Sequence, residues 1–319
     1  MNSLKMNKKI IYSLLSFLLL LGVSCDDDTT SPITVVDDYD HESQIAIDQA
    51  KLDTYFEEHY VNETVSGEFE LLTVGSEGIP DGETLLSEDP KLLSIEGIEA
   101  NGTVTDYTMY YYMTAEGADT SGFGSPCPID SVFVKYTGMT LDGAVFDSRP
   151  VYPVWLQLSV VVQGWSRGLT KFQRGTFKSL PDDDFEFENE GKGFLFFPSG
   201  LGYRNFSQGS IPANSPLIFE IELDDVNLID TDLDTVPTKF EITIDTAGNL
   251  TFYDTDGDGF DDYTDKDDDN DQKLTKEEVA SEYTTFDARG DIEFTYDATG
   301  DTIVAKGTTD GLPNYKTSE

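Results

Sequence analysis

Hydrophobic and polar positions alternate through the middle of this 319-residue chain. Val132, Val134 and Tyr136 alternate with Phe133 and Lys135, a period of two that predicts a strand with one buried face. The dipeptide at 142–143 is Asp-Gly, a strong short-range hairpin signal that returns the chain as a second strand. The pattern therefore predicts an antiparallel strand pair in this part of the chain.

The period changes after Gly164, where Trp165, Leu169 and Phe172 recur at the spacing of one helical face. Further on, GFLFF predicts a strand that ends in a glycine-rich loop. A last strand is predicted where Leu217, Phe219, Ile221 and Leu223 alternate with Ile218, Glu220 and Glu222. The predicted fold class is α+β, an antiparallel β-sheet wrapped on one short helix.

The flanking regions give weaker patterns. Leu52, Tyr55, Phe56 and His59 recur at helical spacing and predict an amphipathic helix over 42–60. This helix either packs on the core or forms a dimer contact. Residues 61–105 show no motif, and from Asp106 the run YTMYYYMTAEG predicts the first strand of the sheet. The acidic run between Gly175 and Gly191 is expected to form a surface loop.

Eight short motifs of the central region resemble, in their order, those of FKBP-type peptidyl-prolyl cis-trans isomerases. They are VKYTGM from Val134, Asp142-Gly143, Phe146-Asp147-Ser148, VVQGW from Val161, Gly168-Leu169, PSGLGY from Pro198, Ile211-Pro212 and LIFEIEL from Leu217. The resemblance covers about a third of the chain and implies an FKBP-like domain over 106–229. It also implies isomerisation of Xaa-Pro bonds in polypeptide substrates, with no catalytic cofactor.

The same resemblance implies the residues of a substrate cleft. Trp165 corresponds to the floor beneath the proline ring. Other residues correspond to the walls, the polar rim and the apolar lining of the cleft. The implied catalytic residues are Tyr136, Phe146, Asp147, Trp165, Tyr203 and Phe219, and the implied substrate-binding residues are Val161, Val162 and Ile211. The backbone N–H of Val162 corresponds to a donor to the ligand carbonyl.

Two positions depart from the family pattern. Arg204 stands where a glycine usually follows the rim tyrosine, and the usual wall phenylalanine is replaced by Val154 or Leu156. These changes affect the choice of residue before proline or the level of activity, while the fold is kept.

The net charge and the histidine content of the chain exclude several classes of function. The chain has 62 acidic and 20 basic residues, a formal net charge of -42, which argues against nucleic acid partners because phosphates require a cationic surface. His41 and His59 are the only histidines, which excludes histidine-based catalysis and most zinc sites.

The N-terminus has the pattern of an export signal. Lys5, Lys8 and Lys9 precede an apolar run that ends in VSC at Cys25. The segment 1–24 resembles a bacterial lipoprotein signal peptide, which implies lipidation of Cys25, membrane attachment through that lipid and a location in the bacterial cell envelope. Simple secretion is the alternative. Residues 25–42 are an acidic tether, and the remaining Cys127 leaves no partner for an intramolecular disulfide.

The C-terminal part carries alternating carboxylates. Two calcium-binding loops are predicted within 237–283, because oxygen ligands at alternate positions suit Ca²⁺. The first loop has Gly259 at the sixth place, where such loops turn sharply, and the second has Gln272 there. The candidate ligands are Asp254, Asp256, Asp258, Asp262 and Asp265 in one loop, and Asp267, Asp269, Asp271 and Glu278 in the next. Such loops resemble EF-hand or thrombospondin type 3 repeats, and a solvated acidic linker is the alternative. Residues 238–254 predict one or two strands, and 284–319 are expected to form a polar tail.

Two functions from different classes remain. The first is a peptidyl-prolyl isomerase of the cell envelope that assists the folding of exported proteins. The second is a non-catalytic surface lipoprotein that keeps the FKBP fold as a protein-binding module stiffened by calcium. Neither the oligomeric state nor the role of residues 43–105 follows from the sequence.

Overall fold

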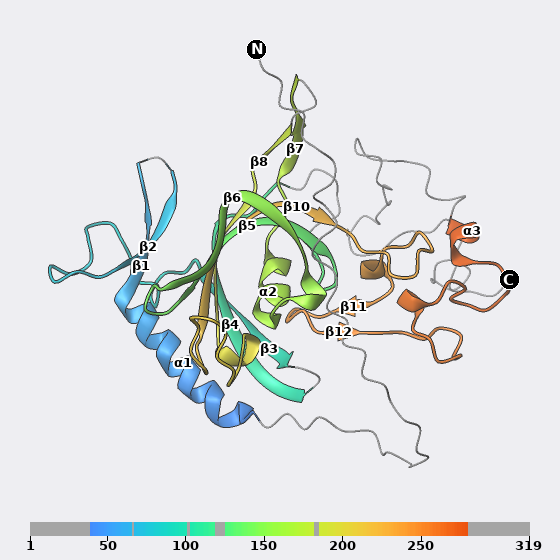
Figure 1. Ribbon diagram of the computed structural model, residues 1–319, viewed down its shortest axis with the longest axis horizontal. Coiled ribbons are helices and arrows are strands. Elements are labelled where there is room, and N and C mark those ends of the chain that lie inside the picture. Colours follow the sequence, from blue (N-terminus) through green and yellow to red (C-terminus); the bar gives the residue numbers. More distant parts are fainter. Residues whose placement is uncertain (1–38, 66, 101–102, 119–124, 182–184, 280–319) are drawn as a thin grey trace, which may run out of the picture. The chain divides into compact units, whose positions relative to one another are not determined.

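The computed structural model describes residues 39–65, 67–100, 103–118, 125–181 and 185–279, without the side chains of residues 103–105 and 278–279. Figure 1 shows their arrangement. The helices are α1 (His41–Glu58), α2 (Gln163–Gly168) and α3 (Thr275–Val279). The strands are β1 (His59–Glu63), β2 (Phe69–Thr73), β3 (Leu92–Ala100), β4 (Thr103–Ala115), β5 (Ser131–Thr140), β6 (Val145–Gln157), β7 (Thr176–Ser179), β8 (Phe185–Glu188), β9 (Gly191–Phe197), β10 (Leu217–Asn227), β11 (Thr243–Ile244) and β12 (Leu250–Thr251). The fold class is α+β, as predicted.

Six strands form one antiparallel sheet in the order β3-β4-β9-β10-β5-β6. The predicted pair around Asp142-Gly143 is confirmed as β5 and β6, with Gly143 at a φ of 80° in the turn. Asp142 supports this turn, since its carboxylate accepts a hydrogen bond from the Thr140 hydroxyl. The strands β9 and β10 and the short helix α2 are also confirmed.

The inner face of the sheet packs on α2 and forms the inner core. Leu217, Phe219, Ile221 and Leu223 of β10 all face this side, as their alternation predicted. They contact Trp165 and Leu169, which follow the helical spacing recognised in the sequence. Cys127 is buried, and burial raises the pKa of its thiol, so it behaves as a small apolar side chain.

The outer face of the sheet packs on α1 and forms the outer core. Leu52 and Phe56 of the helix contact Phe196 of β9 and Ile218 of β10. The rings of Phe56 and Phe196 meet edge to face, with centroids 5.3 Å apart. The predicted helix is confirmed, and its apolar face packs on the core of the same chain.

Local chemistry sets the start of α1. The Asp40 carboxylate accepts a hydrogen bond from the backbone N–H of Ser43 (3.1 Å), which satisfies one of the free donors of the first turn. Hydrogen bonding by the side chain of Ser43, followed by this backbone bond, lowers the pKa of the Asp40 carboxyl group. At the other end, the backbone of His59 is extended and leads directly into β1, which pairs with β2.

Two expectations are corrected by the structure. The run from Asp106 belongs to β4, which is the second strand of the sheet, because β3 precedes it at the sheet edge. The region between Gly175 and Gly191 is more than a loop, since β7 and β8 pair there as a hairpin. In that hairpin Phe177, Phe185 and Phe187 contact one another.

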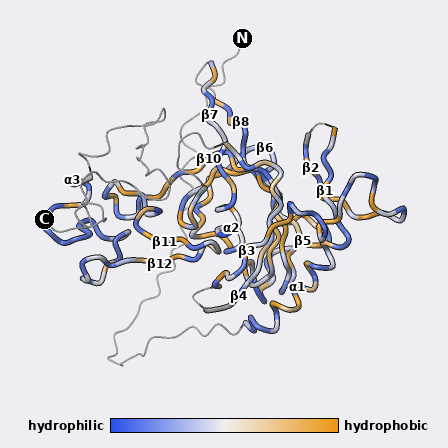
Figure 2. The backbone as a smooth tube through the Cα atoms, turned by 180° about the vertical axis from the view of Figure 1, so that it is seen from behind, coloured by the Kyte–Doolittle hydropathy of each residue, from blue (hydrophilic) through white to orange (hydrophobic). Residues whose placement is uncertain are grey.

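The hydropathy of the chain agrees with a sheet that is covered on both faces. Figure 2 shows hydrophobic segments in the strands of the sheet, whereas the segment that leads to α3 is largely hydrophilic. Within the described residues, no helix is both long enough and apolar enough to cross a membrane. The lipidation site predicted at Cys25 lies outside the described residues.

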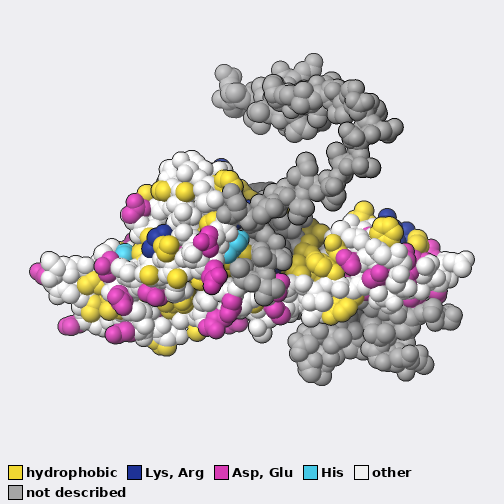
Figure 3. All heavy atoms as spheres, turned by 90° about the horizontal axis from the view of Figure 1, so that it is seen from below, with side chains coloured by type: hydrophobic (Ala, Val, Ile, Leu, Met, Phe, Trp, Pro, Cys, Tyr) yellow, Lys and Arg dark blue, Asp and Glu magenta, His cyan; other side chains and the backbone are white. Residues whose placement is uncertain are grey.

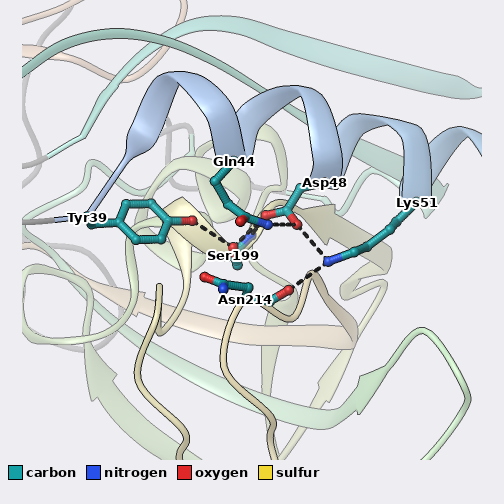
Figure 4. Close-up of polar contacts among 6 residues, drawn as sticks. All are labelled: Tyr39, Gln44, Asp48, Lys51, Ser199 and Asn214. Atoms are coloured by element: carbon teal, nitrogen blue, oxygen red, sulfur yellow. Dashed lines mark hydrogen bonds and ion pairs between the residues drawn. The ribbon is translucent and has the colours of Figure 1, made fainter.

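A buried carboxylate connects α1 to the glycine-rich loop after β9 (Figure 4). Asp48 is completely buried, and its Oδ2 accepts hydrogen bonds from the backbone N–H (2.8 Å) and the hydroxyl (2.5 Å) of Ser199. Its Oδ1 accepts from Gln44 (2.7 Å) and from Lys51 (3.1 Å). Lys51 also donates to the backbone carbonyl of Asn214 (2.8 Å), so both ends of the loop 199–214 are held by α1.

Asp48→Ala is expected to lower the free energy of unfolding by about 3 kcal/mol, because the N–H of Ser199 would stay buried without an acceptor and Lys51 would lose its carboxylate. Denaturant unfolding monitored by far-UV circular dichroism measures this change.

The matched control is Asp53→Ala on the exposed side of the same helix, where the carboxylate accepts only from Gln49 (2.7 Å). This variant should change stability by less than about 0.5 kcal/mol. Equal losses for the two variants would contradict a specific role of Asp48.

Candidate active site

The predicted aromatic residues meet at one end of α2. Tyr136 comes from β5, Phe146 from β6, Trp165 from α2 and Phe219 from β10. The ring centroids of Tyr136 and Trp165 are 5.1 Å apart, those of Trp165 and Phe219 are 5.1 Å apart, and both pairs meet edge to face. Phe146 meets Phe219 at 5.5 Å. The structure thus brings four residues from four elements into one aromatic cluster.

The floor of the aromatic cluster is buried, whereas its walls reach solvent. Trp165 is 3% exposed and Phe219 is 5% exposed, while Tyr136 and Phe146 are half-buried. Phe197 stacks on Phe219 with centroids 5.7 Å apart and fixes the orientation of that ring. We call this cluster, with its buried floor and half-buried walls, the aromatic cup.

Gly138 allows the walls to approach each other. A Cβ atom at this position would lie 2.6 Å from the rings of both Phe146 and Phe219, a separation that cannot be relieved by moving either ring alone. Gly138, the glycine of VKYTGM, is therefore required by the close packing of these two rings.

A polar rim lies beside the cup. The Tyr136 hydroxyl donates a hydrogen bond to Oδ2 of Asp147 (2.7 Å), and Asp147 is exposed. Burial, with this hydrogen bond as a smaller contribution, raises the pKa of Tyr136 to about 12. Burial, followed by the charge of Asp147, also raises the pKa of Tyr203. Both phenols stay protonated at neutral pH and can donate hydrogen bonds to a bound peptide.

The apolar lining lies where it was predicted. Val161 and Val162 are half-buried just before α2, Ile211 is buried, and all three contact the inner core. Among the described residues, none accepts a hydrogen bond from the backbone N–H of Val162. A depression of about 250 Å³ borders Val161 and Val162 on one side and Gly202 and Arg204 on the other. A chain bound there would pass the free N–H.

The structure also locates the two departures from the family pattern. Arg204 has a φ of 55°, so an arginine adopts the left-handed backbone that the usual glycine provides without strain. The backbone N–H of Asn214 donates to the Arg204 carbonyl (2.8 Å) and holds this conformation. Leu156 packs against the inner core and takes the place of the usual wall phenylalanine.

The sequence did not predict which residues hold the loop that carries Tyr203 and Ile211. Asp48 of α1 holds its first residue, Ser199, as described above. Only one signal was available: an acid on the apolar side of an amphipathic helix, close to the buried Leu52.

The predicted metal ligands divide into groups. Oxygens of Asp254, Asp256 and Asp258 lie within 4.8 Å of one another, and so do those of Asp267, Asp269 and Asp271. The other three candidate ligands do not join these groups in the described residues. Asp262 accepts from the N–H (2.8 Å) and the hydroxyl (2.9 Å) of Thr255, Asp265 accepts from the backbone of Lys266 and Asp267, and the side chain of Glu278 is not described.

A third acidic group was not predicted. It contains Asp230, Asp232 and Asp234, and Asp234 also lies with Glu241 and Asp268. The alternate spacing of its first three members was the signal that could have found it.

Comparison with known proteins agrees with the geometry of the cup. The family model for FKBP-type peptidyl-prolyl cis-trans isomerase matches residues 124–224. A probable FKBP-type isomerase from Haemophilus influenzae is 39% identical over 101 residues, 31% of this chain and 36% of the relative. FkpA from Escherichia coli is 32% identical over 128 residues, 39% of this chain and 40% of the relative.

Among solved structures, crystalline FkpA from Escherichia coli matches with a TM-score of 0.35 and 23% identity, over 59% of this chain and 62% of that chain. A peptidyl-prolyl isomerase from Pseudomonas syringae matches with a TM-score of 0.32 and 25% identity, over 44% of this chain and 84% of that chain. The chain spans about a third to two fifths of the length of the two curated relatives named above. Within this chain, the residues that build the aromatic cup belong to a domain of the FKBP type.

Proposed function

We propose that the FKBP-type domain is a peptidyl-prolyl cis-trans isomerase. The observation that carries this proposal is the aromatic cup, in which Trp165 and Phe219 form a buried floor below the half-buried Tyr136 and Phe146. The proline ring of a substrate is apolar and matches the floor in character. The rim of Tyr136, Asp147 and Tyr203 provides hydrogen bonds to the peptide that flanks it.

The cup favours rotation through differential binding. A planar imide is resonance-stabilised, and the barrier to its rotation is roughly 18–20 kcal/mol. In the twisted transition state the resonance is lost, so the carbonyl is less polarised and depends less on water. An apolar cup therefore binds the twisted form more tightly than the planar form, and this difference lowers the barrier. No bond is broken, so no cofactor is needed.

Two donors orient the substrate in this scheme. The free N–H of Val162 binds a carbonyl of the peptide next to the proline ring. The Tyr203 hydroxyl binds backbone on the opposite side, where burial and the charge of Asp147 keep the phenol protonated. These contacts restrain both sides of the rotating bond, so that rotation takes place about the Xaa-Pro bond alone.

The proposed setting is the bacterial cell envelope, with exported polypeptides as substrates. The export signal at 1–24 and Cys25 support this setting, and we include lipid attachment at Cys25 in the proposal. Acidic side chains are spread over the face shown in Figure 3, with few lysines and arginines among them. Such a surface keeps a folding catalyst soluble beside unfolded clients and disfavours nucleic acid.

Trp165→Leu and Asp147→Ala are expected to lower kcat/KM for a Xaa-Pro peptide by at least about tenfold, equivalent to roughly 1.4 kcal/mol in the barrier. Trp165→Leu removes the cup floor, and Asp147→Ala removes the acceptor of Tyr136. A protease-coupled isomerisation assay on a series of Xaa-Pro tetrapeptides measures the rates.

The matched control is Trp155→Leu at the only other tryptophan. Trp155 is half exposed on the other side of β6, where it stacks on Phe133 with centroids 5.0 Å apart. This variant should keep the wild-type rate. If wild-type protein at micromolar concentration leaves the uncatalysed rate unchanged, the domain is a binding module without catalysis.

We also propose that the loops at 254–258 and 267–271 bind Ca²⁺ as a structural ion. Each places three carboxylates within 4.8 Å, and Asp254 accepts from the N–H groups of Gly257 (2.8 Å) and Gly259 (3.1 Å), which curls the loop around the group. Without a cation these carboxylates repel one another.

Added calcium is expected to raise the melting temperature of the wild-type protein, because an ion that binds only the folded state stabilises it. The double variant Asp256→Asn with Asp271→Asn should show a smaller rise. Differential scanning calorimetry in chelator and in millimolar calcium measures both shifts, and equal shifts in the two proteins would refute calcium binding by these loops.

A further inference from the structure

The third acidic group is the most deeply buried charge cluster in the described residues. Asp234, Glu241 and Asp268 are each 1% exposed, and oxygens from all three lie within 4.8 Å of one another. Asp234 also belongs to a second group with Asp230 and Asp232, whose oxygens meet the same limit. Five carboxylates therefore converge around Asp234. None of them belongs to the two loops' carboxylate groups described above.

Two carboxylates of this cluster, Asp232 and Asp234, each have an oxygen without a visible partner among the described residues. No hydrogen bond from a described residue reaches Oδ2 of Asp232 or Oδ2 of Asp234. Within the described part of the chain, neither carboxylate forms an ion pair with a lysine, an arginine or a histidine. A buried carboxylate that is neither paired nor fully hydrogen-bonded is strongly disfavoured.

Carboxylates that lie this close together and away from water repel one another. The ionised cluster therefore destabilises the fold unless a positive charge is bound among its oxygens. Stability lost in this way would have to be restored by an external cation.

The positions along the chain match a calcium loop. Counting from Asp230, carboxylates occupy places one, three, five and twelve, the last being Glu241. Val236 occupies place seven, where such loops use a backbone carbonyl. The backbone at place six is left-handed, with a φ of 84° at Thr235. Thr235 stands where glycine is usual, and this hides the loop from motif searches.

The two loops further along the chain repeat the geometry. Left-handed backbone recurs at place four in Leu233, Gly257 and Asn270, and at place six in Thr235, Gly259 and Gln272. In each loop the N–H at place nine donates to the carbonyl before place one: Thr238 to Ile229, Asp262 to Tyr253 and Thr275 to Lys266. The segment 230–278 thus contains three copies of one loop, the first of which carries buried acids.

We propose that Asp230, Asp232, Asp234 and Glu241, together with Asp268 from the third loop, bind one Ca²⁺ ion. The donors are all hard oxygens, and five carboxylates with one carbonyl supply the six to eight ligands that Ca²⁺ takes. The group holds no histidine or cysteine, which disfavours zinc. A cage built almost wholly from protein disfavours Mg²⁺, which retains several waters.

Because Asp268 belongs to the third loop, an ion bound at this site connects two separate loops. The ion connects residues 230–241 with the start of the third loop and so fixes the course of the acidic segment. Residues beside this segment contact the FKBP-type domain: Ile229 N–H donates to Asp130 (3.1 Å), and Lys239 donates to the Ser125 carbonyl (2.9 Å). Further along, the turn before β12 accepts hydrogen bonds from Arg167 and Lys171, beside the helix that carries Trp165.

The test uses the full chain in the background Asp256→Asn with Asp271→Asn, which disables the other two loops. Native mass spectrometry at increasing calcium counts the ions bound, and calorimetry gives the melting temperature in chelator and in calcium. The background protein should bind one ion per chain and keep a calcium-dependent rise in melting temperature. Adding Glu241→Gln should abolish both, and adding Asp268→Asn should weaken calcium binding at least tenfold.

The melting temperature measured in chelator distinguishes loss of a calcium ligand from general damage to packing. Because Glu241→Gln removes one of the repelling charges and keeps the shape, it should melt no lower than its background without calcium. A background protein that binds no calcium would overturn the proposal. So would a Glu241→Gln protein that keeps the ion, or one that is less stable than its background in chelator. None of these readouts depends on isomerase activity or on the calcium affinity of the other loops.

Discussion

The structure depends on a sheet that is covered on both faces. In β10 the residues Phe219 and Ile221 face α2, whereas Ile218 between them faces α1. A strand in this position cannot exchange one face for the other without placing a charged residue in a core. The two faces are therefore coupled, because the residues that form the floor of the aromatic cup belong to a strand held from behind by α1.

The same coupling extends to the loop 199–214. Its first residue is hydrogen-bonded to Asp48 of α1, and its end is held by Lys51 through the Asn214 carbonyl. This loop carries Tyr203 at the rim and Ile211 in the lining. The helix that covers the outer face thus also sets the position of half the rim, and the N-terminal extension is a structural part of the site. The acidic segment also accepts hydrogen bonds from Arg167 of α2 and from Lys171 just after this helix, so that it contacts the element that carries Trp165.

Much of the fold could be predicted because period-two alternation in β5 and β10 and the helical spacing after Gly164 are local signals. The cup residues were found through motif order, and the structure brings Tyr136, Phe146, Trp165 and Phe219 together. β3 was missed because register shifts near Ile95 and Ile98 break its alternation.

Other features could not be found in the sequence for physical reasons. The contact of Asp48 with Ser199 joins residues 151 positions apart, and the one local sign of it, an acid on the apolar side of α1, does not identify the partner. The hairpin of β7 and β8 was masked by the acidic run between its strands. The loop that begins at Asp230 was missed although its alternate aspartates are a local signal, because the left-handed backbone of Thr235 and the burial of the acids cannot be read from the sequence.

The central claim is that the aromatic cup catalyses rotation about the Xaa-Pro bond. Two-dimensional exchange NMR on a labelled Xaa-Pro peptide, with protein present at about a hundredth of the peptide concentration, tests it most directly. Exchange cross-peaks between the cis and trans forms, absent without protein on the same mixing time, are the predicted result. Shifts or broadening of the peptide signals without any exchange cross-peak would show binding without catalysis and would contradict the account.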